Sequence, residues 1–166
     1  MRRSDREITD REELLEVMGR CDVCRLALNG PEGWPYNVPV TIVRRGEELF
    51  FHCALEGQKV DCLRRDSRVC VTAVGDTHIP PDKFTTEYES AVAFGLAEEV
   101  TDPMEKTEAL RLLCQRHVPS NMADFETSVA RSLDRTGVWR VRITSLTGKR
   151  KKYDAAGKEM KFGRME

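Results

Sequence analysis

The chain has no long hydrophobic run. Among its 166 residues, no stretch approaches the roughly 18 apolar residues that a membrane-spanning helix needs. Residues 1–18, MRRSDREITDREELLEVM, are charged throughout and lack the apolar centre of a secretory signal peptide. We therefore expect no membrane partner and a cytoplasmic location.

An excess of charge of one sign is also missing. The 27 basic and 28 acidic residues leave a net charge of −1, so no overall field draws the protein to nucleic acid or acidic lipid. The one basic run is Lys149 to Lys152, at the start of a polar tail whose charge is diluted by Asp154 and Glu159. A role of this tail as a nucleic-acid arm is therefore the less favoured alternative.

Motifs for metal and nicotinamide binding are absent. Cys21 and Cys24 form a CxxC pair, but no second pair and no spaced histidines complete a zinc site. No G-x-G-x-x-G follows a strand pattern, so nothing indicates a Rossmann-type domain. The six cysteines mostly lie in apolar runs, which predicts free thiols packed as small hydrophobes. His78 and His117 show no partner and are interpreted as structural or exposed.

What the chain does contain is a series of short apolar segments. The hydrophobic share of 40% and the charged share of 33% suit one soluble domain. Strands are expected at 23–29, 35–45, 48–55, 68–74, 89–100 and 138–146, and helices at 10–19, 57–66, 102–117 and 124–133. No repeat and no regular βαβ alternation occurs. The pattern predicts a mainly β protein, a small antiparallel barrel with accessory helices, in one domain (1–150) followed by a polar basic tail (151–166).

The segment FFHCALEGQK carries the strongest local signal. A strand ends here and a helix begins at Gly57, which leaves unpaired backbone N–H groups that suit a phosphate. Lys59 lies in the first helical turn, where a cation opposes the helix dipole unless an anion neutralises it. The alternative is a solvated Lys59 that pairs with Glu56 or Asp61.

His52 is the candidate catalytic residue. It alternates with Phe50 and Ala54 on one strand face and lies beside the expected phosphate site. It can contact a cofactor or a substrate there. The alternative is a half-buried histidine with a backbone hydrogen bond.

Two further segments have polar groups that a ligand can use. Pro35 and Pro39 cannot donate to a sheet ladder, so this segment is expected at an edge or in an irregular region. The backbone of Val40, Thr41 and Ile42 can there bind the edge of a flat heterocycle such as a flavin. The same prolines can simply protect an edge from aggregation. Ser90 is expected to donate to a phosphate if its strand neighbours the helix that begins at Gly57.

The ordered set REITD, PYNVPV, LFFHCALEGQKVDCLRRDSRVCVTAV, YESAVAFGLAEEV and ITSLTGKR resembles the pyridoxamine-phosphate-oxidase-like flavoproteins. Within them it is most similar to the nitroimidazole-resistance branch. The resemblance covers roughly residues 6–150. It implies an antiparallel split β-barrel, a homodimer, and FMN bound in a cleft between the two subunits.

The resemblance also implies which residues contact FMN. Those at the phosphate are Gly57, Lys59 and Ser90. Those along the ring are Val40, Thr41, His52, Cys53 and Ala54, and Lys149 reaches the site from near the dimer interface. Glu89 departs from the family, where a basic residue is frequent, and strand alternation is expected to point it away from Ser90.

The activity implied by the resemblance is transfer of a hydride or electrons from reduced FMN to a small electron-poor acceptor such as a nitroaromatic. The protein positions the reactants and excludes water from them. His52 is the expected proton donor. An alternative from another class is a flavin or haem binding protein or sensor without turnover. Fold does not determine substrate, so the electron donor and the physiological acceptor stay open.

Overall fold

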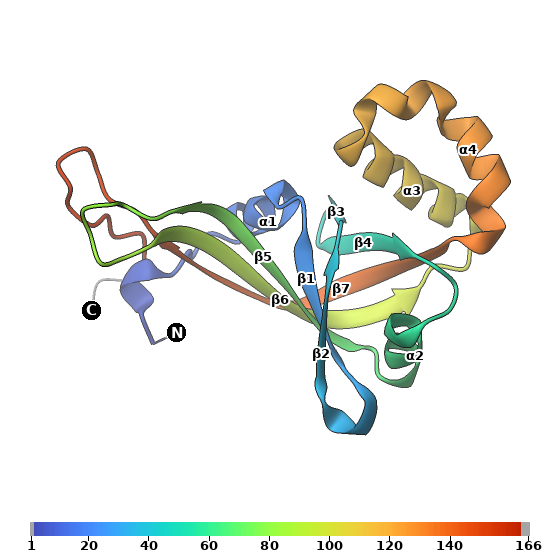
Figure 1. The fold of residues 1–166 in the computed structure, drawn as a ribbon, viewed down its shortest axis with the longest axis horizontal. Coiled ribbons are helices and arrows are strands. Elements are labelled where there is room, and N and C mark those ends of the chain that lie inside the picture. The colour runs from blue at the N-terminus through green and yellow to red at the C-terminus, as the bar shows by residue number, and fades with distance from the viewer. Residues whose placement is uncertain (1, 164–166) are drawn as a thin grey trace.

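The computed structural model describes residues 2–163, and one curved antiparallel sheet dominates it (Figure 1). The strands are β1 (Cys24–Asn29), β2 (Pro35–Val40), β3 (Val43–Arg45), β4 (Glu48–Cys53), β5 (Arg68–His78), β6 (Glu87–Glu99) and β7 (Gly137–Lys151). Their order in the sheet is β2-β1-β5-β6-β7-β4-β3. The helices are α1 (Arg11–Arg20), α2 (Gln58–Arg65), α3 (Pro103–His117) and α4 (Phe125–Ser132).

The segment 35–45, expected as one strand, forms two strands at opposite edges of the sheet. β2 pairs with β1, and β3 pairs with β4. Thr41 and Ile42 join them, and the Ile42 side chain is buried in the core. Burial of Ile42 turns the chain inward, so the single-strand expectation was wrong. The expected edge is confirmed, because β2, which contains Pro35 and Pro39, lies at one.

The curvature of the sheet follows from this connection. Because the two edge strands are consecutive in the chain, the edges of the sheet approach each other at Thr41 and Ile42. No ladder joins β2 to β3 within residues 2–163. The molecule is therefore mainly β with accessory helices, and its sheet is a split rather than a closed antiparallel barrel, as the sequence predicts.

The main core lies between α1 and the inner face of the sheet. α1 begins at Arg11 because the Asp10 carboxylate accepts a hydrogen bond from the Glu13 N–H at 2.8 Å. Its buried face includes Val17 and Met18, which belong to the same apolar cluster as the inner strand residues. The helix expected at 10–19 is thus confirmed to within one residue at each end.

A second, smaller core lies between the other face of β4 and the layer formed by α3 and α4 (Figure 1). The Asp102 carboxylate caps α3 by accepting from the Glu105 N–H at 2.8 Å. α4 is flanked by 3₁₀ turns at Pro119–Asp124 and Leu133–Arg135. β4 is consequently buried on both sides, with Phe51 in the main core and Phe50 in the second.

The basic run is part of the sheet rather than a free arm. β7 extends to Lys151, beyond the strand end expected at 146. Arg150 pairs with Glu13 at 2.5 Å. The residues that follow fold back on the N-terminus, where Glu159 pairs with Arg6 at 2.8 Å. Residues 164–166 of the expected tail lie outside the described residues.

The six cysteines are free thiols, as expected. Cys21 and Cys24 are buried in the main core, which confirms their interpretation as apolar packing residues. In the described part of the chain, no three His, Cys, Asp or Glu side chains are grouped to hold a metal ion. Among these same residues, no helix is long and apolar enough to cross a membrane.

Candidate functional site

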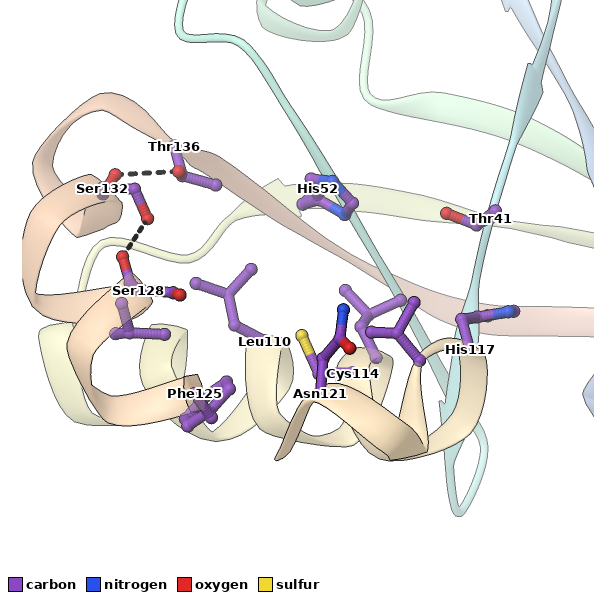
Figure 2. Close-up of a pocket in the computed structure, with 13 residues that line it drawn as sticks. Thr41, His52, Leu110, Cys114, His117, Asn121, Phe125, Ser128, Ser132 and Thr136 are labelled. Carbon is purple, nitrogen blue, oxygen red and sulfur yellow. Dashed lines mark hydrogen bonds between the residues drawn. The ribbon is translucent and has the colours of Figure 1, made fainter. Parts of the chain in front are cut away.

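A cavity of about 500 Å³ lies between the helical layer and the end of β4 (Figure 2). His52 points into it because it lies on the same strand face as Phe50, which packs under α3. Thr41 reaches the cavity from the link between β2 and β3. The full lining is Thr41, His52, Leu110, Leu113, Cys114, His117, Val118, Asn121, Phe125, Ser128, Val129, Ser132 and Thr136.

His52 is neutral in this environment at pH 7. The side chain is exposed to the cavity, yet the surrounding protein removes enough water to lower the pKa of its imidazole from the ordinary 6.5. The positive charge of Lys59 and then the proximity of His117 lower this pKa further. A neutral imidazole has one N–H donor and one acceptor nitrogen, so His52 can hold one exchangeable proton at the cavity wall.

His117 fastens the helical layer to the sheet. Its Nε2 lies 2.8 Å from the Ile42 carbonyl oxygen, and because a carbonyl only accepts, Nε2 is the donor. The contact links the C-terminal end of α3 to the connection that contains Thr41. The structural interpretation of His117 is confirmed, but the sequence does not show that this residue also lines the cavity.

The start of α2 has the features of an anion site. Its N-cap is Gly57, whose φ of 124° is a conformation that favours glycine, and no side chain caps the helix. Lys59 is half-buried in the first turn, and its Nζ lies 5.7 Å from the centre of the Phe51 ring. No carboxylate within residues 2–163 comes within 4.0 Å of Lys59, so the alternative pairing with Glu56 or Asp61 does not form. A phosphate fits these unpaired donors.

The other residues expected along the flavin ring have different surroundings. The Val40 side chain is buried in the main core, so only its backbone can face a ligand. Cys53 is half-buried, and burial raises the pKa of its thiol. Ala54 is exposed just beyond the end of β4. Of this set, Thr41 and His52 line the cavity, whereas Val40 and Cys53 pack against the main core on the other face of the sheet.

Ser90 does not lie beside the helix that begins at Gly57, and this expectation was wrong. α2 leads into Arg68, which pairs with Leu96, whereas Ser90 pairs with Val74 farther along β5. Lys149 lies directly opposite Ser90 on β7, while His52 is opposite Val138. A strand from residue 138 to 149 spans roughly 35 Å. Within one chain, Ser90 and Lys149 therefore lie together but far from Lys59.

Glu89 points away from Ser90, as strand alternation predicts. Its side chain is 2% exposed and pairs with Arg20 at 2.6 Å and with Arg150 at 3.1 Å. Burial alone would raise the pKa of this carboxyl, but the two guanidinium groups outweigh it and lower the pKa below its ordinary value. Glu89 thus belongs to a buried ion-pair network under α1.

The cavity residues from α3 and α4 were not foreseen as site residues. Apolar periodicity identifies Leu110, Leu113 and Phe125 only as core positions, because it cannot show that packing stops short of filling the space below. The polar lining residues Asn121 and Ser128 lie in the stretch after Pro119 and match no sequence motif. The cavity arises from how the two helices rest on β4.

Comparisons with known proteins agree with this architecture. A comparison with curated protein sequences finds no match. A candidate 5-nitroimidazole antibiotic resistance protein from Bacteroides thetaiotaomicron has 24% identity and a TM-score of 0.72, over 86% of this chain and 85% of that one. The FAD and haem binding protein from Mycobacterium smegmatis has 22% identity and a TM-score of 0.76, over 87% and 73%. A flavocytochrome from Azotobacter vinelandii has 17% identity and a TM-score of 0.72, over 95% and 79%.

These solved structures share the fold of this chain. The sequence model of one family, described as pyridoxamine 5′-phosphate oxidase, matches residues 10–150. That range takes in the sheet up to Arg150, the start of α2 and the cavity at His52. The chain belongs to the pyridoxamine 5′-phosphate oxidase family.

Proposed function

We propose that the protein binds FMN and transfers electrons from it to a small electron-poor acceptor such as a nitroaromatic. One observation carries this proposal: Thr41 and His52 line the same cavity, and the chain runs from His52 directly to the uncapped start of α2, where the charge of Lys59 lowers the pKa of His52. A phosphate at Lys59 would leave the attached ring beside His52 and Thr41. Two of the solved structures with this fold are described as FAD and haem binding and as a flavocytochrome, which supports a flavin as the bound group.

The residues that would hold FMN divide into two groups. Gly57 and Lys59 would bind its phosphate, since the first N–H groups of α2 and one ammonium suit a single terminal phosphate. The flavin ring would lie along the side chains of Thr41, His52 and Ala54 and the backbone of Val40 and Cys53. The bound flavin supplies hydride or electron transfer, which protein side chains cannot perform.

The chain itself would position the acceptor, exclude water and supply a proton. Leu110 and Phe125 cover the cavity from the helical layer and keep its wall dry. His52 faces the same space and is kept in its neutral form, so one ring nitrogen can pass its proton to an acceptor that gains negative charge as the other nitrogen takes up a proton from water. We propose His52 as the proton donor in this relay.

We further propose that the site is completed by a second copy of the chain. Ser90 and Lys149 lie too far from Lys59 to share its ligand within one subunit, and they lie beside an exposed face of the sheet. Phe94 and Leu96 on this face are 53% and 48% exposed, which is typical of a surface that another protein covers. A homodimer would bury this face and allow Ser90 and Lys149 of one copy to approach the flavin of the other.

Spectroscopy of the purified protein tests this function. FMN added to the protein should give a bound-flavin absorbance spectrum. After anaerobic reduction with dithionite, a nitroaromatic should reoxidise this flavin. We expect His52→Gln to slow reoxidation at least about tenfold with FMN affinity retained, and His78→Gln, at an exposed position, to leave the rate unchanged.

Three outcomes would contradict parts of the proposal. Absence of FMN binding would refute the flavoprotein assignment. A bound flavin that does not respond to any acceptor would favour the alternative of a flavin carrier or sensor. An unchanged reoxidation rate in His52→Gln would remove His52 from the proton-donor role.

A further inference from the structure

We propose that the cavity below α3 and α4 selects an uncharged, planar aromatic acceptor and excludes phosphorylated compounds. The inference rests on the proposed function only in taking this cavity as the place where the acceptor meets the flavin. The preference for an uncharged ligand follows from the walls of the cavity (Figure 2). It sets this chain apart from an oxidase of a 5′-phosphorylated substrate, after which its family is described.

No charged side chain is available to a ligand in the cavity. The lining contains no Lys, Arg, Asp or Glu among the described residues. Its ionisable members are His52, His117 and Cys114, and burial raises the pKa of the Cys114 thiol, so this group stays protonated at pH 7. A phosphate entering this space would lose water without gaining a counter-charge, which is unfavourable.

Two cations of the helical layer that come close to the second core are already engaged. Arg111 lies over the Phe125 ring, with its guanidinium carbon 4.4 Å from the ring centre, and pairs with Glu126 at 2.7 Å. Lys106 donates to the Leu133 carbonyl oxygen at 2.5 Å. Neither side chain lines the cavity. Recruiting either of them to a phosphate would require breaking an existing contact.

The helix dipole of α3 also opposes an anion. Cys114, His117 and Val118 bring the C-terminal end of this helix to the cavity wall. The C-terminal end of a helix carries partial negative charge on its free carbonyl groups. This end of α3 therefore disfavours a carboxylate or a phosphate beside it and is compatible with a neutral molecule.

The size and the remaining polar groups indicate what would fit. A volume of about 500 Å³ is in the usual range for small-molecule sites. Leu110, Leu113 and Phe125 provide flat apolar walls that suit an aromatic ring. Asn121 and Ser128 carry N–H and O–H donors, which can bind the oxygens of a nitro or carbonyl group.

Two other hydroxyls of the lining, Ser132 at the end of α4 and Thr136 just before β7, are already used as donors. Ser132 donates to the Ser128 carbonyl oxygen at 2.8 Å, and Thr136 donates to the Ser132 carbonyl oxygen at 2.8 Å. Their protons are thus committed to the backbone. This leaves Ser128 as the α4 position where a substitution can change the ligand preference most directly.

A pair of matched ligands tests the preference. We would measure binding of 4-nitrobenzyl alcohol and 4-nitrobenzyl phosphate to the FMN-loaded protein by isothermal titration calorimetry. In this state the anion site at Lys59 is filled, so it cannot capture the second ligand. The neutral alcohol is expected to bind at least about tenfold more tightly than the phosphate. Equal or tighter binding of the phosphate would overturn the inference.

Two substitutions on α4 assign the preference to the cavity. Ser128→Lys would place an ammonium in the lining and should tighten binding of the phosphate at least about tenfold. Thr127→Lys adds the same charge one residue earlier, at an exposed position outside the lining, and should not change it. Equal effects of the two substitutions would refute the cavity as the ligand site.

A second pair of substitutions, both to tryptophan, gives an independent check. Ser128→Trp should fill the cavity and abolish binding of the neutral alcohol, while Thr127→Trp should retain it. FMN absorbance is followed in the same samples. If FMN does not bind to any of them, the proposed function fails, but the ligand preference is still measured with saturating inorganic phosphate in place of FMN.

Discussion

Among single residues, Lys59 and Glu89 differ in whether a neighbouring side chain neutralises their charge. Lys59 lies in the first turn of α2, where the helix dipole opposes a cation, and no acidic side chain within the described range pairs with it. Glu89 is the opposite case, because two arginines surround a carboxylate that is otherwise buried. Both residues lead to direct tests.

Replacing Lys59 with Ala should weaken FMN binding about tenfold or more, because the variant loses a charge-assisted contact to the phosphate. Lys59→Arg should retain most of the affinity. Quenching of FMN fluorescence on titration with protein measures both. Lys158→Ala, an exposed lysine in the tail, is the control. Unchanged affinity in Lys59→Ala would exclude this residue from the phosphate site.

Glu89→Gln should lower the free energy of unfolding by about 2–3 kcal/mol at pH 7, since it leaves two arginines without their buried counter-charge. The pKa of Glu89 is lowered in the folded protein, so its stabilising contribution is present above the unfolded pKa, near 4.5, and is lost as the pH falls. The variant should therefore lose less stability than the parent between pH 7 and pH 4. Urea unfolding at pH 7 and pH 4 measures these stabilities, and the exposed Glu108→Gln is the control. Equal losses of unfolding free energy in Glu89→Gln and the parent would contradict the buried ion-pair role of Glu89.

At the scale of elements, the site depends on how the layer of α3 and α4 is held against the sheet. The second core fixes α3 over Phe50, and the His117 hydrogen bond to the Ile42 carbonyl fixes its C-terminal end. The connection that contains Thr41 is itself short and unpaired in the sheet. Its position relative to the cavity therefore depends on His117.

His117→Ala should lower the free energy of unfolding by about 1–2 kcal/mol, because a half-buried hydrogen bond is lost and the Ile42 carbonyl loses its partner. Hydrogen exchange followed by mass spectrometry should show faster exchange in peptides covering residues 41–45. Peptides from α2, which packs against β1, should be unaffected. Unchanged exchange at 41–45 would show that His117 does not hold this connection.

At the scale of the whole molecule, the described chain leaves its proposed cofactor contacts in two separate groups. Gly57 and Lys59 lie at one end of the sheet, and Ser90 and Lys149 lie toward the other. Between them the outer face of the sheet exposes Phe94 and Leu96. The proposed homodimer accounts for both the separation and the exposed apolar face.

Phe94→Glu should convert this dimer to a monomer, because a carboxylate would be buried without a partner at the interface. Met104→Glu introduces the same charge on α3, at a side chain that is 83% exposed, and should leave the dimer intact. Light scattering coupled to size-exclusion chromatography measures the mass. FMN affinity should fall together with dimerisation. A monomeric parent protein, or an unchanged dimer in Phe94→Glu, would contradict the proposal.

Features that depend on near neighbours in the chain could be predicted from the amino acids alone. The cap at Asp10, the turn at Gly57 and the opposite orientations of Glu89 and Ser90 follow from helix ends and strand alternation, which involve only a few consecutive residues. The edge position of Pro35 also follows from a local cause, the missing N–H. Such features were predicted because the residues that produce them are adjacent in the sequence.

Which distant segments meet could be seen only in the folded chain. The division of 35–45 into two edge strands, the separation of Ser90 from Lys59 and the contact of His117 with Ile42 all depend on the order of strands in the sheet. The cavity depends on how two helices pack over β4. These outcomes arise from side chains that are far apart in the chain and compete for the same buried space, and no local pattern records the result of that competition.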